Sequence, residues 1–159
     1  MFRADVFSKF GFAVKILIME DDPREVIAAE KAVREFGLES LLVKEYCDPS
    51  NLDNVILGVL SDVFIGSEPQ GFGLAWKCQQ LGLPVCVVTK VVGHEYAGWK
   101  DPILQSIKDA GIPVFISRSE RKDWPDAMNK LGELMHARFL SGEDPLSRSY
   151  QRYVKNVSK

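Results

Sequence analysis

Three adjacent acidic residues, Glu20, Asp21 and Asp22, are the side chains of this sequence best suited to chemistry. They follow the apolar run 16–19 and come directly before Pro23. Carboxylates at the carboxyl end of a buried strand lie where α/β proteins hold their ligands. Because like charges repel one another when they lie so close together, this position favours a bound cation.

The elements that must position these carboxylates follow a repeated pattern of helix, glycine and apolar strand. Gly37, Gly82 and Gly111 each stand where a helix is expected to end in a left-handed turn. The strands predicted at 85–88 and 114–116 follow prolines and are nearly continuous apolar runs, as in parallel strands covered on both faces. Strands that alternate with helices predict an α/β domain with a doubly wound five-stranded parallel sheet and helices on both faces.

The first helix after the acidic residues has a strong start signal. Asp22 suits the N-cap and Pro23 suits the first helical position. Glu25 then stands at the third position, which predicts a start resembling a capping box. Asp22 is therefore assigned to capping, and Glu20 and Asp21 are left as the candidate ligand-binding pair.

The third strand of the sheet has two alternative positions. Apolar residues in the segment 52–60 recur at the spacing of an amphipathic helix. On that interpretation the third strand is 62–66 and ends at Ser67. The alternative makes 55–61 the strand and places Asp62 at its carboxyl end. We favour the first interpretation because the periodicity is helical.

Composition limits the class of protein. An apolar fraction of 46% with 26% charged residues is typical of one globular domain with a core of its own. The net charge of −2 argues against a nucleic-acid partner held by a broad basic face. No apolar run approaches the roughly 18 residues of a membrane span, so a membrane partner is not expected. Three cysteines without a C-x-x-C pair indicate reduced thiols and a cytoplasmic protein.

The predicted domain occupies residues 14–140. Residues 1–13 are expected to form a short helical arm or a disordered leader, because they lack the uninterrupted apolar centre of a secretory signal. Residues 141–159 are polar and partly basic, and they predict a flexible tail.

Over roughly residues 14–139 the sequence resembles a response-regulator receiver domain. The resemblance rests on the run 16–23, on the strand–helix order, on Thr89 at the end of the fourth strand and on Phe115 in the fifth. Receivers hold Mg²⁺ with an acidic pair after the first strand and accept phosphate on an aspartate after the third. A hydroxyl ends the fourth strand, an aromatic lies in the fifth, and a lysine ends the fifth. Glu20 and Asp21 match the acidic pair.

Two positions depart from the pattern that the resemblance implies. The phosphoacceptor position falls on Ser67 or Gly66, and the position of the lysine falls on Arg118. A serine hydroxyl is a poor nucleophile without an adjacent base, and it brings no charge to a metal. A guanidinium pairs strongly with carboxylates. We therefore predict that Arg118 pairs with Glu20 or Asp21 in place of a metal.

The favoured hypothesis is a degenerate receiver, or pseudo-receiver, of two-component signal transduction. Such a module is not an enzyme, needs no cofactor and acts through a protein partner; a homodimer is compatible with it. The interaction surface is expected to include the loop 90–100, with Tyr96 and Trp99, and the last helix.

Two alternatives remain open. The first is a phosphorylatable receiver that uses Asp62 together with Mg²⁺ at Glu20 and Asp21. The second is a small-ligand-binding α/β domain, with its ligand above Glu20, Ser67 and Thr89.

Overall fold

The computed structural model describes residues 1–9, 14–90 and 100–157. Its strands are β1 (Val14–Met19), β2 (Ser40–Val43), β3 (Val55–Asp62), β4 (Val85–Lys90) and β5 (Val114–Ser117). Its α-helices are α1 (Asp5–Lys9), α2 (Pro23–Glu35), α3 (Gln70–Leu81), α4 (Lys100–Asp109), α5 (Trp124–Ser141) and α6 (Pro145–Val157). The strands form one parallel sheet in the order β2-β1-β3-β4-β5, which confirms the predicted fold class.

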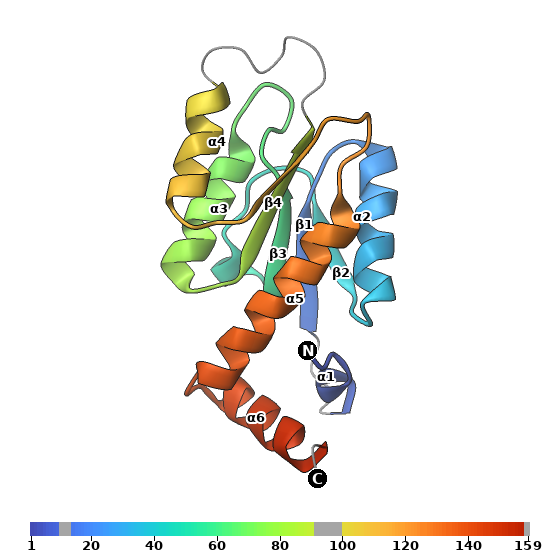
Figure 1. The fold of residues 1–159 in the computed structure, drawn as a ribbon, viewed down its shortest axis with the longest axis vertical. Helices are drawn as coiled ribbons and strands as arrows, with labels where there is room; N and C mark the ends of the chain where they lie inside the picture. Colours follow the sequence, from blue (N-terminus) through green and yellow to red (C-terminus); the bar gives the residue numbers. More distant parts are fainter. Residues whose placement is uncertain (10–13, 91–99, 158–159) are drawn as a thin grey trace.

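Helices cover both faces of this sheet (Figure 1). On one face, α2 and α5 pack over a core that includes Ile16, Leu60 and Trp124. On the other face, α3 and α4 pack over a second core that includes Leu17 and Val87. The neighbouring residues Ile16 and Leu17 thus belong to opposite cores. Both faces of the central strands are buried, so these strands carry nearly unbroken apolar sequence.

The glycine turns lie where the sequence predicts them. Gly37, Gly82 and Gly111 have φ angles of 90°, 68° and 81°, a region that a β-carbon disfavours. Each therefore ends its helix and returns the chain toward the sheet.

The favoured position of the third strand was wrong. Strand β3 runs from Val55 to Asp62, and the segment predicted to be a helix forms most of it. A register shift between β1 and β3 places Ile16 opposite Gly58, so Leu57 is an extra residue in the ladder. Residues 55–60 are apolar except for Gly58 because β3 is central and covered on both faces, and such a run also contains helical spacings.

The predicted flexible tail was also wrong, because most of it forms helix α6. Figure 1 shows α5 extending past the sheet, with α6 and α1 side by side at its end. Tyr150 of α6 is fully buried and stacks on Phe2 with ring centroids 5.5 Å apart. Its hydroxyl accepts a hydrogen bond from the backbone N–H of Arg3 at 3.0 Å and lies 2.7 Å from Nδ1 of His136. The two ends of the chain are thereby fixed to α5.

Tyr96 and Trp99 of the predicted interaction loop lie outside the described residues. A membrane-spanning helix would need a long apolar segment, and none of the helices in the described ranges provides one.

Candidate functional site

The acidic residues of β1 and β3 meet at the carboxyl edge of the sheet. Met19 pairs with Ser61 across these two strands, so the next residues, Glu20 and Asp62, are neighbours. Carboxylate oxygens of Glu20, Asp21 and Asp62 all lie within 4.8 Å of one another. These three residues are called the acidic cluster below. Glu20 and Asp62 are buried, whereas Asp21 is exposed.

Lys122 supplies the positive charge that faces this cluster. Its ammonium Nζ lies 2.6 Å from Glu20 Oε2 and 2.9 Å from Asp62 Oδ2. Its side chain is 5% exposed, so both ion pairs are shielded from water. Short charge-assisted bonds of this kind are strong and directional. Lys122 stands in the connection between β5 and α5, directly before the α5 N-cap Asp123.

Backbone groups hold the remaining oxygens of the two buried carboxylates. The N–H groups of Asp21 and Asp22 both donate to Glu20 Oε1 at 3.1 Å. The N–H of Phe64 donates to Asp62 Oδ1 at 3.4 Å. Each carboxylate therefore has one oxygen fixed by the backbone and the other facing Lys122.

Burial dominates the ionisation of the acidic cluster. Loss of hydration and the nearby charge of Asp62 raise the pKa of Glu20 to about 7, although Lys122 opposes the shift. Burial likewise raises the pKa of Asp62, with Lys122 acting in the opposite direction. Burial acts to lower the pKa of Lys122, but the two carboxylates outweigh it and raise that pKa overall. Two buried acids thus face a single ammonium, and the raised pKa of Glu20 means that a proton and a further cation compete for this cluster.

The residues predicted for the acceptor and basic positions lie elsewhere. Ser67 is exposed in a turn closed by a bridge between Ile65 and Glu68. Arg118 is also exposed, and the ion pair predicted for it is made by Lys122. Both predictions chose the wrong residue along the chain. The acidic residue at the strand end is Asp62, five residues before Ser67, and the cation is Lys122, four residues after Arg118.

Thr89 and Phe115 lie in the strands predicted for them. Thr89 is fully buried in β4, one residue past Val88, which pairs with Asp62. Phe115 in β5 is half-buried and packs against the core beneath α2 and α5. Thr89 is therefore the last residue but one of β4, which ends at Lys90, and Phe115 packs against the core.

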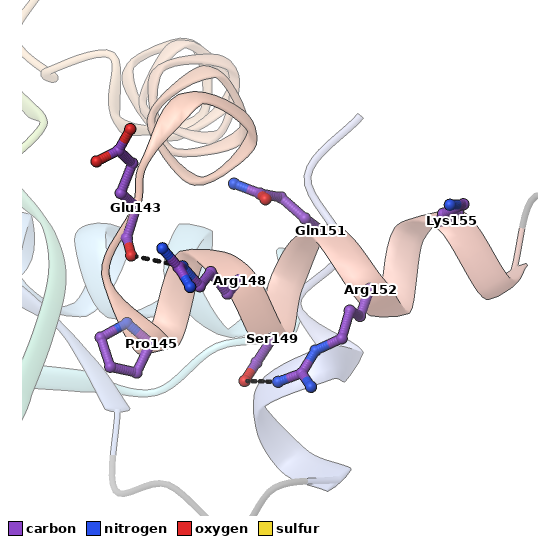
Figure 2. A pocket seen from close by; sticks show the side chains of 7 residues that line it. All are labelled: Glu143, Pro145, Arg148, Ser149, Gln151, Arg152 and Lys155. Carbon is purple, nitrogen blue, oxygen red and sulfur yellow. Dashed lines mark hydrogen bonds between the residues drawn. The ribbon is translucent and has the colours of Figure 1, made fainter.

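A separate cavity of about 730 Å³ lies along α6 (Figure 2). Its lining includes three cations of that helix, Arg148, Arg152 and Lys155. The guanidinium of Arg148 bonds the Glu143 carbonyl oxygen at 2.9 Å, and Arg152 lies 3.5 Å from the Ser149 hydroxyl. No lining residue belongs to the acidic cluster, so the cavity and the cluster are separate features.

The fold and the acidic edge together define a receiver-like α/β domain. Comparison with solved structures supports this fold. The structure is similar to the signal receiver domain of a signal transduction histidine kinase from Syntrophus aciditrophicus, with a TM-score of 0.57 and 18% identity over 82% of this chain and 95% of that one. It is also similar to a sensor protein from Polaromonas sp. JS666, with a TM-score of 0.50 and 15% identity over 77% and 93%. No protein-family model and no curated protein matches the sequence.

Proposed function

We propose that this chain is a receiver-like signalling module that accepts a phosphoryl group on Asp62. The observation that carries the proposal is the position of Asp62 at the carboxyl end of β3, beside Glu20 and bonded to Lys122. The degenerate-receiver hypothesis depended on an acceptor position without a carboxylate. Strand β3 ends at Asp62, and this position supports the alternative in which Asp62 is the acceptor.

The acidic cluster suits Mg²⁺, since it offers three carboxylates and hard oxygen ligands are the ones that this ion prefers. Glu20, Asp21 and Asp62 would hold the ion, which supplies charge neutralisation for the phosphoryl group when it is bound. Lys122 already neutralises part of the charge on Glu20 and Asp62.

The chemical step uses the carboxylate of Asp62 as nucleophile. An Asp62 oxygen forms a bond to phosphorus, and the bond from phosphorus to the donor's leaving group breaks. The leaving group departs with the electron pair and takes up a proton from water. Lys122 stays close enough to stabilise charge on the transferred oxygens. In this proposal the chain receives phosphate as a cytoplasmic signal and is not an enzyme acting on other substrates.

Output passes through contact with a protein partner on the side of α4, β5 and α5. Strand β5 is at the edge of the sheet, and its residue Ile116 is 37% exposed. An edge strand with an exposed apolar residue suits protein contact.

Intact-mass measurement tests the proposal directly. The full chain is incubated with Mg²⁺ and a small phosphodonor such as acetyl phosphate or phosphoramidate. We expect the added mass of one phosphoryl group, removable by hydroxylamine and absent from Asp62→Asn or after chelation of Mg²⁺. The control Ser67→Ala changes the residue of the rejected register and should be phosphorylated normally. A folded chain that accepts no phosphate from any donor would instead be the degenerate module that acts by contact alone.

A further inference from the structure

Glu25 is a buried carboxylate outside the acidic cluster, and its bonds converge on the residue that serves the cluster. It lies in the first turn of α2 and is 1% exposed. Its side chain does not complete the predicted capping box. The carboxylate points instead toward the connection between β5 and α5. There it accepts hydrogen bonds from the Arg121 side chain, the Lys122 backbone and the Trp124 indole.

The three donors lie on both sides of Lys122 and on Lys122 itself. Arg121 donates from Nε to Glu25 Oε1 at 3.1 Å, and Trp124 donates from its indole to Oε2 at 2.8 Å. The backbone N–H of Lys122 lies 3.4 Å from each oxygen. Arg121 also donates to the backbone carbonyl of Arg24 at 3.2 Å, which fastens the connection to α2 a second time.

These bonds matter because Lys122 reaches the cluster from a connection without regular structure. A lysine has a flexible four-carbon stem, so its ammonium is placed accurately only where its backbone is fixed. Glu25 fixes that backbone, and Trp124, which is fully buried, anchors it to the core. A buried carboxylate is expensive to desolvate unless hydrogen bonds satisfy it, and Glu25 receives its bonds from this connection. Hydrogen bonds depend on angle as well as distance, so these contacts fix the orientation of the connection.

We propose that Glu25 is a positioning residue that sets the reach of Lys122 to Glu20 and Asp62. A consequence, which rests on the proposed function, is that Glu25 also tunes phosphoryl transfer to Asp62 without touching the phosphoryl group. The placement of Lys122 stands on geometry alone, so it is tested separately from phosphorylation.

Lysine labelling with an acylating reagent and mass spectrometry tests the placement. In the unmodified chain Lys122 should be strongly protected, since its side chain is 5% exposed and bonded twice. Glu25→Gln keeps the size of the side chain but turns an amide N–H₂ toward one of the donors. We expect Lys122 to become about tenfold more reactive in this variant, whereas Lys77 and Lys130 keep their reactivity.

Two further variants make the result specific. Arg121→Ala removes the half-exposed bond to Glu25 but leaves those from Trp124 and Lys122, so Lys122 should stay protected. If Glu25→Gln fails to fold, Glu25→Asp keeps the charge but shortens the reach, and it should expose Lys122 in the same way. Unchanged protection of Lys122, or an equal rise at Lys77, Lys130 and Lys122, would overturn the proposal.

A double-mutant cycle on phosphorylation tests the consequence. Glu25→Gln and Lys122→Met should each slow the appearance of phosphate on Asp62 about tenfold or more. Their combination should be no slower than Lys122→Met alone, because Glu25 then has no ammonium to place. Independent, multiplying losses would refute the link. If the unmodified chain takes no phosphate, the proposed function fails, and the labelling result still decides the role of Glu25.

Discussion

Lys122→Met is the substitution that most directly probes the acidic cluster. Methionine keeps the unbranched stem but removes the ammonium that lies 2.6 Å from Glu20 and 2.9 Å from Asp62. The side chains of Lys122, Glu20 and Asp62 are 5%, 0% and 8% exposed, so water cannot replace the lost charge. Removing one partner of a buried ion pair costs about 3–5 kcal/mol. We therefore expect the free energy of unfolding to fall by about that amount near pH 8.

The loss should shrink as the pH falls. Because the pKa of Glu20 in the folded protein is raised from 4.5 to about 7, the folded chain binds more protons at this group than the unfolded chain between these two pH values. Stability of the unmodified chain contributed by this group is therefore present at low pH and declines as the pH rises toward 7. Without Lys122 the pKa values of Glu20 and Asp62 rise further, so the free energy of unfolding of the variant declines over a wider range of pH. As the pH falls below about 7 Glu20 takes up a proton, and the difference between the variant and the unmodified chain becomes smaller.

Urea unfolding at about pH 5 and about pH 8 measures both quantities. The matched control is Lys130→Met, which removes an exposed ion pair with Glu133 at 3.2 Å and should cost about 0–1 kcal/mol at either pH. An effect of Lys122→Met that is equal at both pH values, or no larger than that of Lys130→Met, would refute the argument that the cluster is buried and coupled.

Three other predictions follow from single contacts. Gly71→Ala would place a β-carbon 1.7 Å from the Asp62 carbonyl oxygen and should lower the free energy of unfolding by about 3 kcal/mol or more. Its control on the same helix is Gly73→Ala, where the nearest atom is 3.9 Å away; this change should be neutral or raise the free energy of unfolding by up to about 1 kcal/mol. Urea unfolding compares the two variants. Tyr150→Phe should lower it by about 1–3 kcal/mol, because the Arg3 N–H loses its acceptor; an unchanged midpoint would mean that α6 docks without this bond. The affinity for Mg²⁺, measured calorimetrically, should weaken about tenfold per pH unit below about 7, because protons compete for Glu20; a flat profile would exclude Glu20 as a ligand.

The sequence predicted those parts of the fold that depend on local signals. Gly82 and Gly111 end helices as expected, and the strands that follow them start where the prolines allow. The order of the sheet then follows from alternating strands and helices. Strand β3 could not be placed in this way, because a central strand buried on both faces has no alternation to separate it from a helix. Leu57, the extra residue in the ladder between β1 and β3, also interrupts the regular pairing of the two strands.

Helix α6 was missed for a different reason. Its surface is polar and basic, and only a few apolar residues such as Tyr150 face inward. Those residues gain their burial from α5 and α1, which are distant in sequence. Composition alone therefore indicated a solvated tail, whereas the tertiary contacts stabilise a helix.

The identity of the cation at the acidic cluster depends on burial, which the sequence does not give. Two buried acids require a counter-charge, and the connection after β5 offers Arg118, Arg121 and Lys122. Arg121 is half-exposed, and its guanidinium bonds Glu25 and not the acidic cluster. Between Glu20 and Asp62 there is a place for a compact ammonium, which makes one short bond to each. The half-exposed position beside Glu25 therefore suits the broad guanidinium of Arg121, and the narrow buried position between Glu20 and Asp62 suits the compact ammonium of Lys122.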